Sequence, residues 1–258
     1  MKVPVHDKSG KAGKQVDLPP VFATPYRTDL ILKAVSVSRA NRRQRYGTSP
    51  MAGARHATAS AGKGRGLSRV PRKWNNSGAL APGTIGGRRA HPPEARRSFK
   101  EKINDKERRL AIASALAATA NVDMVRARGH RFKEGLATPV VLADDALKQL
   151  KAKDAIALLV AVGVSEDTIR AKENVKERPG VGKMRGRRLK KPKSLLIVTE
   201  SPDDGRGFAN LVGVDVVPAR SLNAELLAPG GHAGRLVLFS ESSLKSLSNY
   251  GVVQEVKA

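Results

Sequence analysis

The segment Pro179–Lys183 reads Pro-Gly-Val-Gly-Lys and has the residue types of a phosphate-binding loop. A nucleotide-binding loop of this kind needs a glycine five residues before its Gly-Lys pair, and a Ser or Thr after the lysine to reach magnesium. Those two positions hold Glu177 and Met184. A basic loop that contacts RNA phosphates therefore explains the segment better than a nucleotide site does.

A second glycine-rich segment, Gly62–Gly66, reads Gly-Lys-Gly-Arg-Gly. It is too dense in glycine for a dinucleotide fingerprint and follows no expected strand. Glycine lets a backbone run close to another surface, and the interleaved Lys63 and Arg65 are suited to phosphate contacts. A flexible linker is the alternative, but linkers are seldom so rich in arginine, which favours nucleic-acid contact.

No residues stand at the spacing of a metal site or a catalytic group. The chain has no cysteine, which removes thiolate nucleophiles and sulfur-ligated zinc sites. The histidines are scattered, and none stands at ligand spacing to another: His6, His56, His91, His130 and His232. We therefore predict no catalytic residues, no metal and no cofactor, and the chain is not expected to be an enzyme.

Trp74 is the only tryptophan, and it lies outside the apolar segments. Arg72 and Lys73 precede it, and Asn75 and Asn76 follow it. Stacking of a nucleobase on the indole is one interpretation. Packing of the indole on its own loop is the other, and the sequence alone does not separate the two.

Most of the positive charge lies in two segments. The net charge is +25, from 48 Lys and Arg against 23 Asp and Glu. Residues 39–100 hold 15 Lys and Arg and one acid, and residues 176–193 hold nine and one, so together they supply +22. The rest of the chain is nearly neutral. Positive charge concentrated in two segments repels itself, and this predicts a polyanionic partner, either nucleic acid or an anionic membrane.

A membrane is the weaker candidate partner. No stretch approaches the roughly 18–20 apolar residues of a spanning helix. The first residues, Met1–Asp7, lack the apolar core of a signal peptide. We therefore expect a nucleic-acid partner, no membrane and a cytoplasmic location, which the absence of cysteine fits.

The elements that must carry these segments follow from hydrophobic periodicity. Helices are expected over 24–38, 105–120, 144–162, from 165 and over 240–248, and strands over 122–127, 139–142, 195–198, 213–217 and 236–239. Continuous apolar strands separated by helices predict an α/β fold, with a mostly parallel sheet and helices on both faces.

The segment 45–99 is poor in large aliphatic residues and cannot bury a core by itself. We expect it to form a long, basic, irregular loop extension that orders only against its partner. Residues 1–44 and 100–258 are expected to form a single α/β globular domain, which carries the shorter basic loop 176–193.

Several long strings resemble one family. They are RRQRYGTSPMAG (42–53), GRGLSRVPR (64–72), GGRRAHPP (86–93), KEKINDKERRLAIASALAATA (100–120), RPGVGKMRGRR (178–188) and NLVGVDVVPARSLNAELLAPGGHAGRL (210–236). In this order they resemble large-subunit ribosomal protein four, the universal "L four" family. GGRRAHPP, the most specific string, indicates the archaeal type.

This resemblance implies an α/β domain on the outer face of the large ribosomal subunit. It also implies that the loop 45–99 penetrates the large rRNA, supports its assembly and reaches the wall of the peptide exit tunnel. The expected partners are large-subunit rRNA, neighbouring large-subunit proteins and the nascent peptide. An RNA-modifying enzyme, or another nucleic-acid-binding protein with a basic extension, is the alternative.

The site residues expected from these arguments are basic, aromatic or glycine. Contacts to rRNA are expected from Arg42, Arg43, Arg45, Arg55, His56, Lys63, Arg65, Arg69, Arg72, Lys73, Trp74, Arg88, Arg89, His91, Arg96, Arg97, Lys183, Arg185, Arg187 and Arg188. The residues expected nearest the tunnel are Gly62, Gly64, Arg65, Gly66, Arg69, Arg72 and Lys73, within the segment Gly62–Trp74.

Overall fold

The structure is a computed structural model that describes residues 1–247, and Ser248, the last residue of the helix expected over 240–248, lies outside them. The chain divides into two compact units. The globular unit combines residues 1–38 with the described part of 102–258, and the loop unit is residues 39–101. The globular unit holds all the regular strands. The loop unit begins with the last residues of a helix that starts in the globular unit, and after Asn41 it consists of turns, bends, irregular segments and single bridges.

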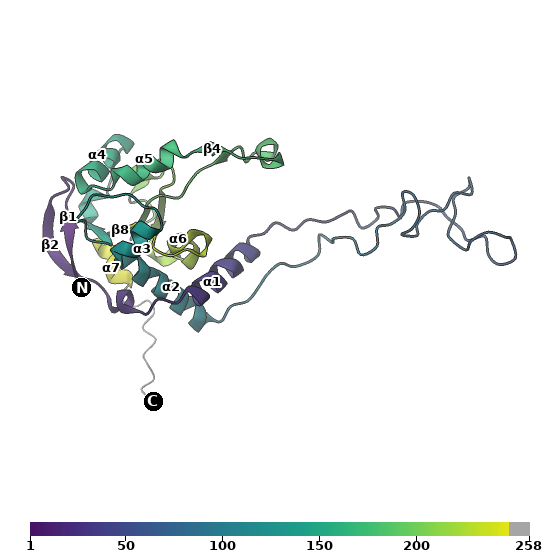
Figure 1. The fold of residues 1–258 in the computed structure, drawn as a ribbon, viewed down its shortest axis with the longest axis horizontal. Coiled ribbons are helices and arrows are strands. Elements are labelled where there is room, and N and C mark those ends of the chain that lie inside the picture. Colours follow the sequence, from purple (N-terminus) through teal and green to yellow (C-terminus); the bar gives the residue numbers. More distant parts are fainter. Residues whose placement is uncertain (248–258) are drawn as a thin grey trace, which may run out of the picture. The chain divides into compact units, whose positions relative to one another are not determined.

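A six-stranded sheet in the order β2-β1-β3-β8-β6-β7 forms the centre of the globular unit (Figure 1). Its strands are β1 (Lys2–His6), β2 (Ala12–Asp17), β3 (Val140–Leu142), β6 (Leu196–Thr199), β7 (Asp215–Pro218) and β8 (Val237–Ser240). Only β1 and β2 pair antiparallel, and every other pair is parallel. The predicted mostly parallel sheet is confirmed. The β1–β2 hairpin was not predicted, because β2 is largely exposed and shows no apolar alternation.

Alternate residues of the parallel strands face two separate hydrophobic clusters. In β3, Val141 packs into the cluster that includes α1 (Thr28–Asn41), α2 (Asp105–Ala120), α6 (Ala224–Leu227) and α7 (Glu241–Leu247). Its neighbours Val140 and Leu142 pack into the opposite cluster, with α4 (Ala152–Val162) and Val125. The predicted helices on both faces are therefore confirmed.

Two predicted helices show how local signals set helix boundaries. Helix α2 has the predicted bounds, and the Asn104 side chain caps it by accepting a hydrogen bond from the Lys106 N–H at 3.0 Å. The sequence offers Thr24 or Thr28 as the start of helix α1, and the helix begins at Thr28. Pro25 disfavours a helical conformation at Thr24, which explains the later start.

The strand expected over 122–127 is wrong, because these residues form helix α3 (Val122–Ala127). The Asn121 side chain accepts hydrogen bonds from the N–H groups of Asp123 and Met124, at 3.0 and 3.4 Å. This cap satisfies backbone donors that a helix start leaves unpaired. The asparagine cap therefore favours a helix in a segment whose apolar content alone had suggested a strand.

The single helix expected over 144–162 is also wrong at its start. Residues Asp144–Ala146 form one 3₁₀ turn, and α4 begins only at Ala152. Between them, Gln149 has a φ of +50°, a left-handed conformation that ends helical geometry. Asp144 instead caps another element: its carboxylate accepts hydrogen bonds from the Ser242 N–H and hydroxyl, at 3.1 and 2.8 Å.

Candidate nucleic-acid interface

The two ends of the loop unit, residues 41–43 and 97–101, contact each other. We call this region the root of the loop unit, and the two chain segments that run from it the arms. The guanidinium groups of Arg43 and Arg97 lie over the Phe99 ring, at 4.5 and 5.4 Å from its centroid. Nearby, the Glu101 N–H donates to the Asn41 side-chain oxygen at 2.9 Å. Both arginines remain exposed, so they tie the arms together and still present charge to a partner. Phe99 was not predicted as a site residue.

Beyond the root, the arms lie against each other where glycine leaves room. The Thr48 N–H donates to the Pro93 carbonyl at 2.9 Å. A side chain at Gly47 would collide with the backbone of Pro93–Ala95, and one at Gly53 with that of Gly87 and Arg88. This close backbone approach makes the loop unit a narrow double-armed structure (Figure 1).

Arg72 organises the distal part of the loop unit. Its backbone exchanges two hydrogen bonds with Ala59, at 3.0 and 3.1 Å, and forms a second bridge to Gly78. Its guanidinium donates to the Asn76 carbonyl and to the Ser68 hydroxyl, both at 2.8 Å. Arg72 is half-buried by these contacts. The phosphate contact or lumen-facing role that the sequence predicts for Arg72 stays a prediction, and the structure adds that hydrogen bonds of this side chain shape the loop.

The glycine-rich segment forms an exposed run of turns. Gly62, Gly64 and Gly66 all have positive φ, +76°, +77° and +66°, and nothing lies within 4 Å of where their side chains would be. A positive φ at every second residue is accessible mainly to glycine. Lys63 and Arg65 are both exposed between these glycines. The segment thus presents cations to its surroundings, with open space beside its three glycines.

Most of the other predicted rRNA contacts are exposed side chains. Lys73 is half-buried like Arg72; those exposed are Arg42, Arg43, Arg45, Arg55, His56, Lys63, Arg65, Arg69, Trp74, Arg88, Arg89, His91, Arg96, Arg97, Lys183, Arg185, Arg187 and Arg188. Trp74 is 97% exposed, so it does not pack on its own loop, and base stacking stays a prediction. Ile85, which was not predicted, is 100% exposed.

The second basic segment is a formed hairpin of the globular unit. Strands β4 (Lys176–Glu177) and β5 (Leu189–Lys190) pair antiparallel, and a 3₁₀ turn, Val181–Arg185, closes their connection. The Arg178 N–H donates to the Arg188 carbonyl at 2.8 Å. The Gly-Val-Gly-Lys sequence therefore lies at the tip of a hairpin, not between a buried strand and a helix. This geometry removes the nucleotide-loop interpretation.

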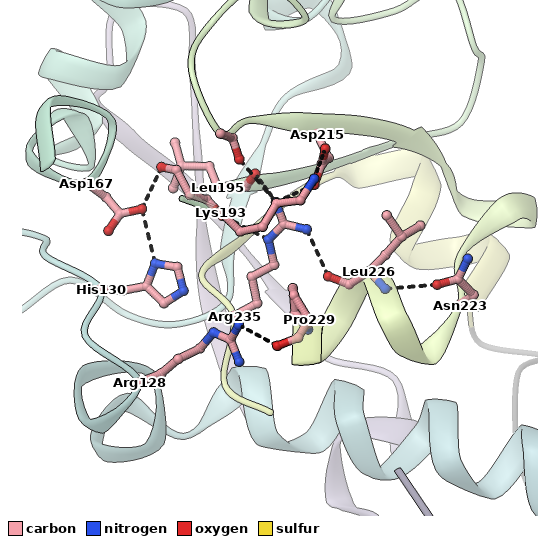
Figure 2. A network of polar contacts seen from close by, with 12 residues as sticks. Arg128, His130, Asp167, Lys193, Leu195, Asp215, Asn223, Leu226, Pro229 and Arg235 are labelled. Carbon is pink, nitrogen blue, oxygen red and sulfur yellow. Dashed lines mark hydrogen bonds and ion pairs between the residues drawn. The ribbon is translucent and has the colours of Figure 1, made fainter. Parts of the chain in front are cut away.

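A buried carboxylate holds the two roots of this hairpin together (Figure 2). Asp167 lies on α5 (Ser165–Glu173), which leads into the hairpin, and Ser194 lies on the chain that leaves it. Asp167 accepts hydrogen bonds from the Ser194 hydroxyl at 2.6 Å, His130 Nδ1 at 3.0 Å and Arg170 Nε at 2.9 Å. Burial would raise the pKa of Asp167, but these donors hold it well below its usual range.

A fully buried arginine extends this network. Arg235 donates to the carbonyls of Ser194 at 2.8 Å and Leu226 at 2.9 Å, and to the Asp215 carboxylate at 2.6 Å (Figure 2). Lys193 donates to both oxygens of Asp215 at 2.8 Å. Sequence reasoning missed Arg235, because a charged residue beside an apolar strand gives no signal of its partners.

The described residues offer neither a metal site nor a membrane span. Residues 1–247 contain no group of three or more His, Asp or Glu side chains that could hold a metal ion. Within the same range, no helix is long and apolar enough to cross a membrane.

Comparison with known proteins places the sequence in one group. The family model for the ribosomal protein L4/L1 family matches residues 16–250. A relative from Halorubrum lacusprofundi, "Large ribosomal subunit protein uL4", is 46% identical over 249 residues, which are 96% of this chain and 100% of the relative. Proteins of the same name from Thermoplasma acidophilum and Methanococcoides burtonii are 45% and 48% identical. These two alignments cover 95% and 93% of this chain, and 97% and 95% of the relatives.

Proposed function

The chain belongs to the ribosomal protein L4/L1 family, and we propose that it is a structural component of the large ribosomal subunit that binds the large rRNA. Membership confirms the resemblance drawn from the sequence, and its named relatives are archaeal, as expected. The role is structural and not enzymatic. No observation favours the RNA-modifying enzyme that the sequence had left as an alternative.

The observation that carries rRNA binding is the exposure of the two basic segments. Together they supply +22 of the net +25, and 18 of the 20 predicted rRNA-binding side chains are exposed. In both segments, backbone hydrogen bonds hold two stretches of chain side by side, and in the loop unit these stretches approach closely at glycine residues. Each segment therefore exposes many cations along a narrow backbone structure. Lys and Arg arranged in this way suit the phosphates of a folded RNA.

We also infer that the loop unit supports rRNA assembly and contributes to the wall of the peptide exit tunnel. The segment Gly62–Trp74 is the part of the loop proposed to lie nearest the nascent chain. About 20 residues separate it from the root on either side, and an extended chain gains up to about 3.3 Å per residue. Its glycines leave Arg65 in open surroundings.

Two measurements test this proposal. The chain should co-sediment with the large subunit after a moderate salt wash, and recovery only as free protein would remove the ribosomal role. In assembled subunits, Arg65→Glu should alter nascent-chain stalling, whereas Arg65→Lys should not. Arg65 is exposed, so reversing its charge leaves the loop fold intact. Normal stalling by assembled Arg65→Glu subunits would remove the tunnel assignment and leave rRNA binding standing.

A further inference from the structure

The globular unit contains a pocket of about 520 Å³ that lies outside both basic segments. Tyr26 lines it from the segment just before α1 and Leu32 from α1 itself. Met124 and Arg128 line it from α3 and its C-terminal end, and His232 from the loop before β8. Pockets that hold small ligands or single chemical groups fall in this size range.

The wall formed by the loop before β8 is fixed in place. Arg128 donates hydrogen bonds to the carbonyls of Pro229, at 3.1 Å, and of His232 (Figure 2 shows the first). Gly231 has a φ of +88°, and a side chain there would collide with Leu32. Glycine therefore lets this loop lie directly on α1, so the pocket is built by specific contacts.

The charge of Arg128 in this pocket is positive, and the nearest carboxylate that acts on it, Asp167, does not line the pocket. Arginine carries five N–H donors, and carbonyls take two of those of Arg128. No carboxylate lines the pocket among the described residues. Burial and the nearby charges of Arg235 and Arg170 lower the pKa of Arg128, and the charge of Asp167 opposes them, so that the pKa lies at about 10 and the group stays charged at neutral pH. A half-buried cation among other cations is stabilised by an anionic ligand.

Apart from Arg128, Thr28 and His232, the lining of the pocket is apolar or aromatic, and the pocket is partly open. Tyr26 is 44% exposed and Leu32 is 48% exposed, although both are large hydrophobic groups. A ligand that fits this lining has a flat apolar part for Tyr26 and a negative charge for Arg128. A nucleotide has both, since a base stacks on aromatic rings and its phosphate accepts hydrogen bonds from arginine.

We propose that this pocket takes one unstacked nucleotide of the large rRNA, with its base against Tyr26 and Leu32 and a phosphate on Arg128. The inference rests on the proposed rRNA-binding function and adds a site on the globular unit to it. The absence of carboxylates favours rRNA over a basic protein segment, and the apolar lining adds an element that simple phosphate contacts lack.

The affinity of the full-length chain for a large-rRNA transcript, measured at several salt concentrations, tests the base contact at Tyr26 and the phosphate contact at Arg128 separately. Tyr26→Ala should weaken binding roughly 5- to 150-fold, the range for loss of one stacked base, without changing the salt dependence. Arg128→Gln should lower the log–log salt slope by about 0.7–0.9, the value of one phosphate contact, and Arg128→Lys should restore it. Ile156→Ala, at an exposed position on α4, is the control and should change neither.

Unchanged affinity of a normally folded Tyr26→Ala variant for the transcript would overturn the proposal. If that variant also fails to enter assembled subunits, the pocket binds a neighbouring protein and not rRNA. Because Arg128 anchors the loop before β8, its variants are judged only if their thermal unfolding matches that of the parent. Tyr26→Ala changes an exposed side chain and provides the independent reading.

Photocrosslinking distinguishes failure of this site from failure of the proposed function. With a transcript that carries 4-thiouridine, crosslinks to Tyr26 are expected beside crosslinks to Tyr46 or Trp74 in the loop unit. Crosslinks in the loop unit alone would contradict the pocket and leave rRNA binding intact. The absence of crosslinks from both units would contradict rRNA binding itself.

Discussion

Arg72 shows how a basic residue in a basic loop can serve the fold of that loop. Its guanidinium bonds Asn76 and Ser68, and its backbone bridges Ala59 and Gly78. Sequence reasoning treated it as equivalent to Arg69, which is exposed. The two arginines are three residues apart, so composition cannot separate them, whereas their hydrogen bonds do.

Replacing Arg72 should therefore loosen the loop, and replacing Arg69 should not. In Arg72→Gln bound to an rRNA transcript, we expect faster hydrogen exchange at the amides of Ala59 and Ala79, because the side chain that holds their segments is removed. Arg69→Gln, the matched control, should leave exchange unchanged and lower the salt slope of rRNA binding by about 0.7–0.9, the value of one phosphate contact. Equal exchange in the two variants would contradict an organising role for Arg72.

A second residue-scale prediction concerns the buried charge of Arg235. Asp215→Asn removes its carboxylate partner and leaves a buried guanidinium with carbonyls alone. Breaking a buried pair costs about 3–5 kcal/mol, and we expect the lower end, since Asp215 is 24% exposed. Asp203→Asn breaks an exposed pair with Arg206 and should cost less than about 1 kcal/mol. Urea unfolding measures both, and equal losses would contradict the assigned importance of Arg235.

At the scale of elements, the basic hairpin β4–β5 is anchored by Asp167, and we propose that it binds RNA. Residues 176–193 carry nine Lys and Arg. Replacing them with a short Gly-Ser linker should lower the log–log salt slope of rRNA binding by several units, because each phosphate that the hairpin neutralises adds about 0.7–0.9 to the slope. An unchanged slope would show that the hairpin is merely solvated.

The anchoring carboxylate makes stability depend on pH in a definite direction. The pKa of Asp167 is lower in the folded chain than in the unfolded one, so its ionised form stabilises the fold at neutral pH. This contribution begins to fall below the unfolded pKa, near 4, and disappears as pH falls through the folded value. Asp167→Asn should unfold more easily at pH 7 and should lose less stability between pH 7 and pH 3. Parallel pH profiles for the parent and variant would contradict this account.

Elements with strong local signals were predictable from the sequence. Helix α2 has an asparagine cap and a long apolar face, and strands β3, β6 and β8 are continuous apolar runs, so their positions follow from periodicity. The edge strand β2 depends on its pairing with β1, and local sequence does not encode that pairing. The helix α3 depends on one capping side chain.

The candidate site divides in the same way. Charge counting located both basic segments, because clustered charge is visible without a fold. The Asp167 and Arg235 networks and the Tyr26 pocket were not predicted. They join residues such as His130, Ser194 and Asp215 that are far apart in the chain, and only the tertiary structure brings them together.

At the scale of the whole molecule, the charge distribution separates folding from binding. Outside the two basic segments, the chain is nearly neutral and holds the two hydrophobic clusters that stabilise the sheet. The two basic segments carry almost the entire excess of positive charge, and they contribute little to either hydrophobic cluster. Concentrated charge of one sign repels itself, and a polyanion relieves this repulsion. We therefore expect the free protein to bind RNA strongly at low salt and weakly at high salt.

The central claim is that the loop unit, residues 39–101, is enclosed by large-subunit rRNA. Electron cryo-microscopy of large subunits purified from cells that express this chain tests it most directly. We predict density for the chain in every complete subunit, with rRNA around both arms of the loop and the segment Gly62–Trp74 at the tunnel wall. A chain missing from complete subunits, or a loop surrounded by solvent or protein alone, would contradict the account.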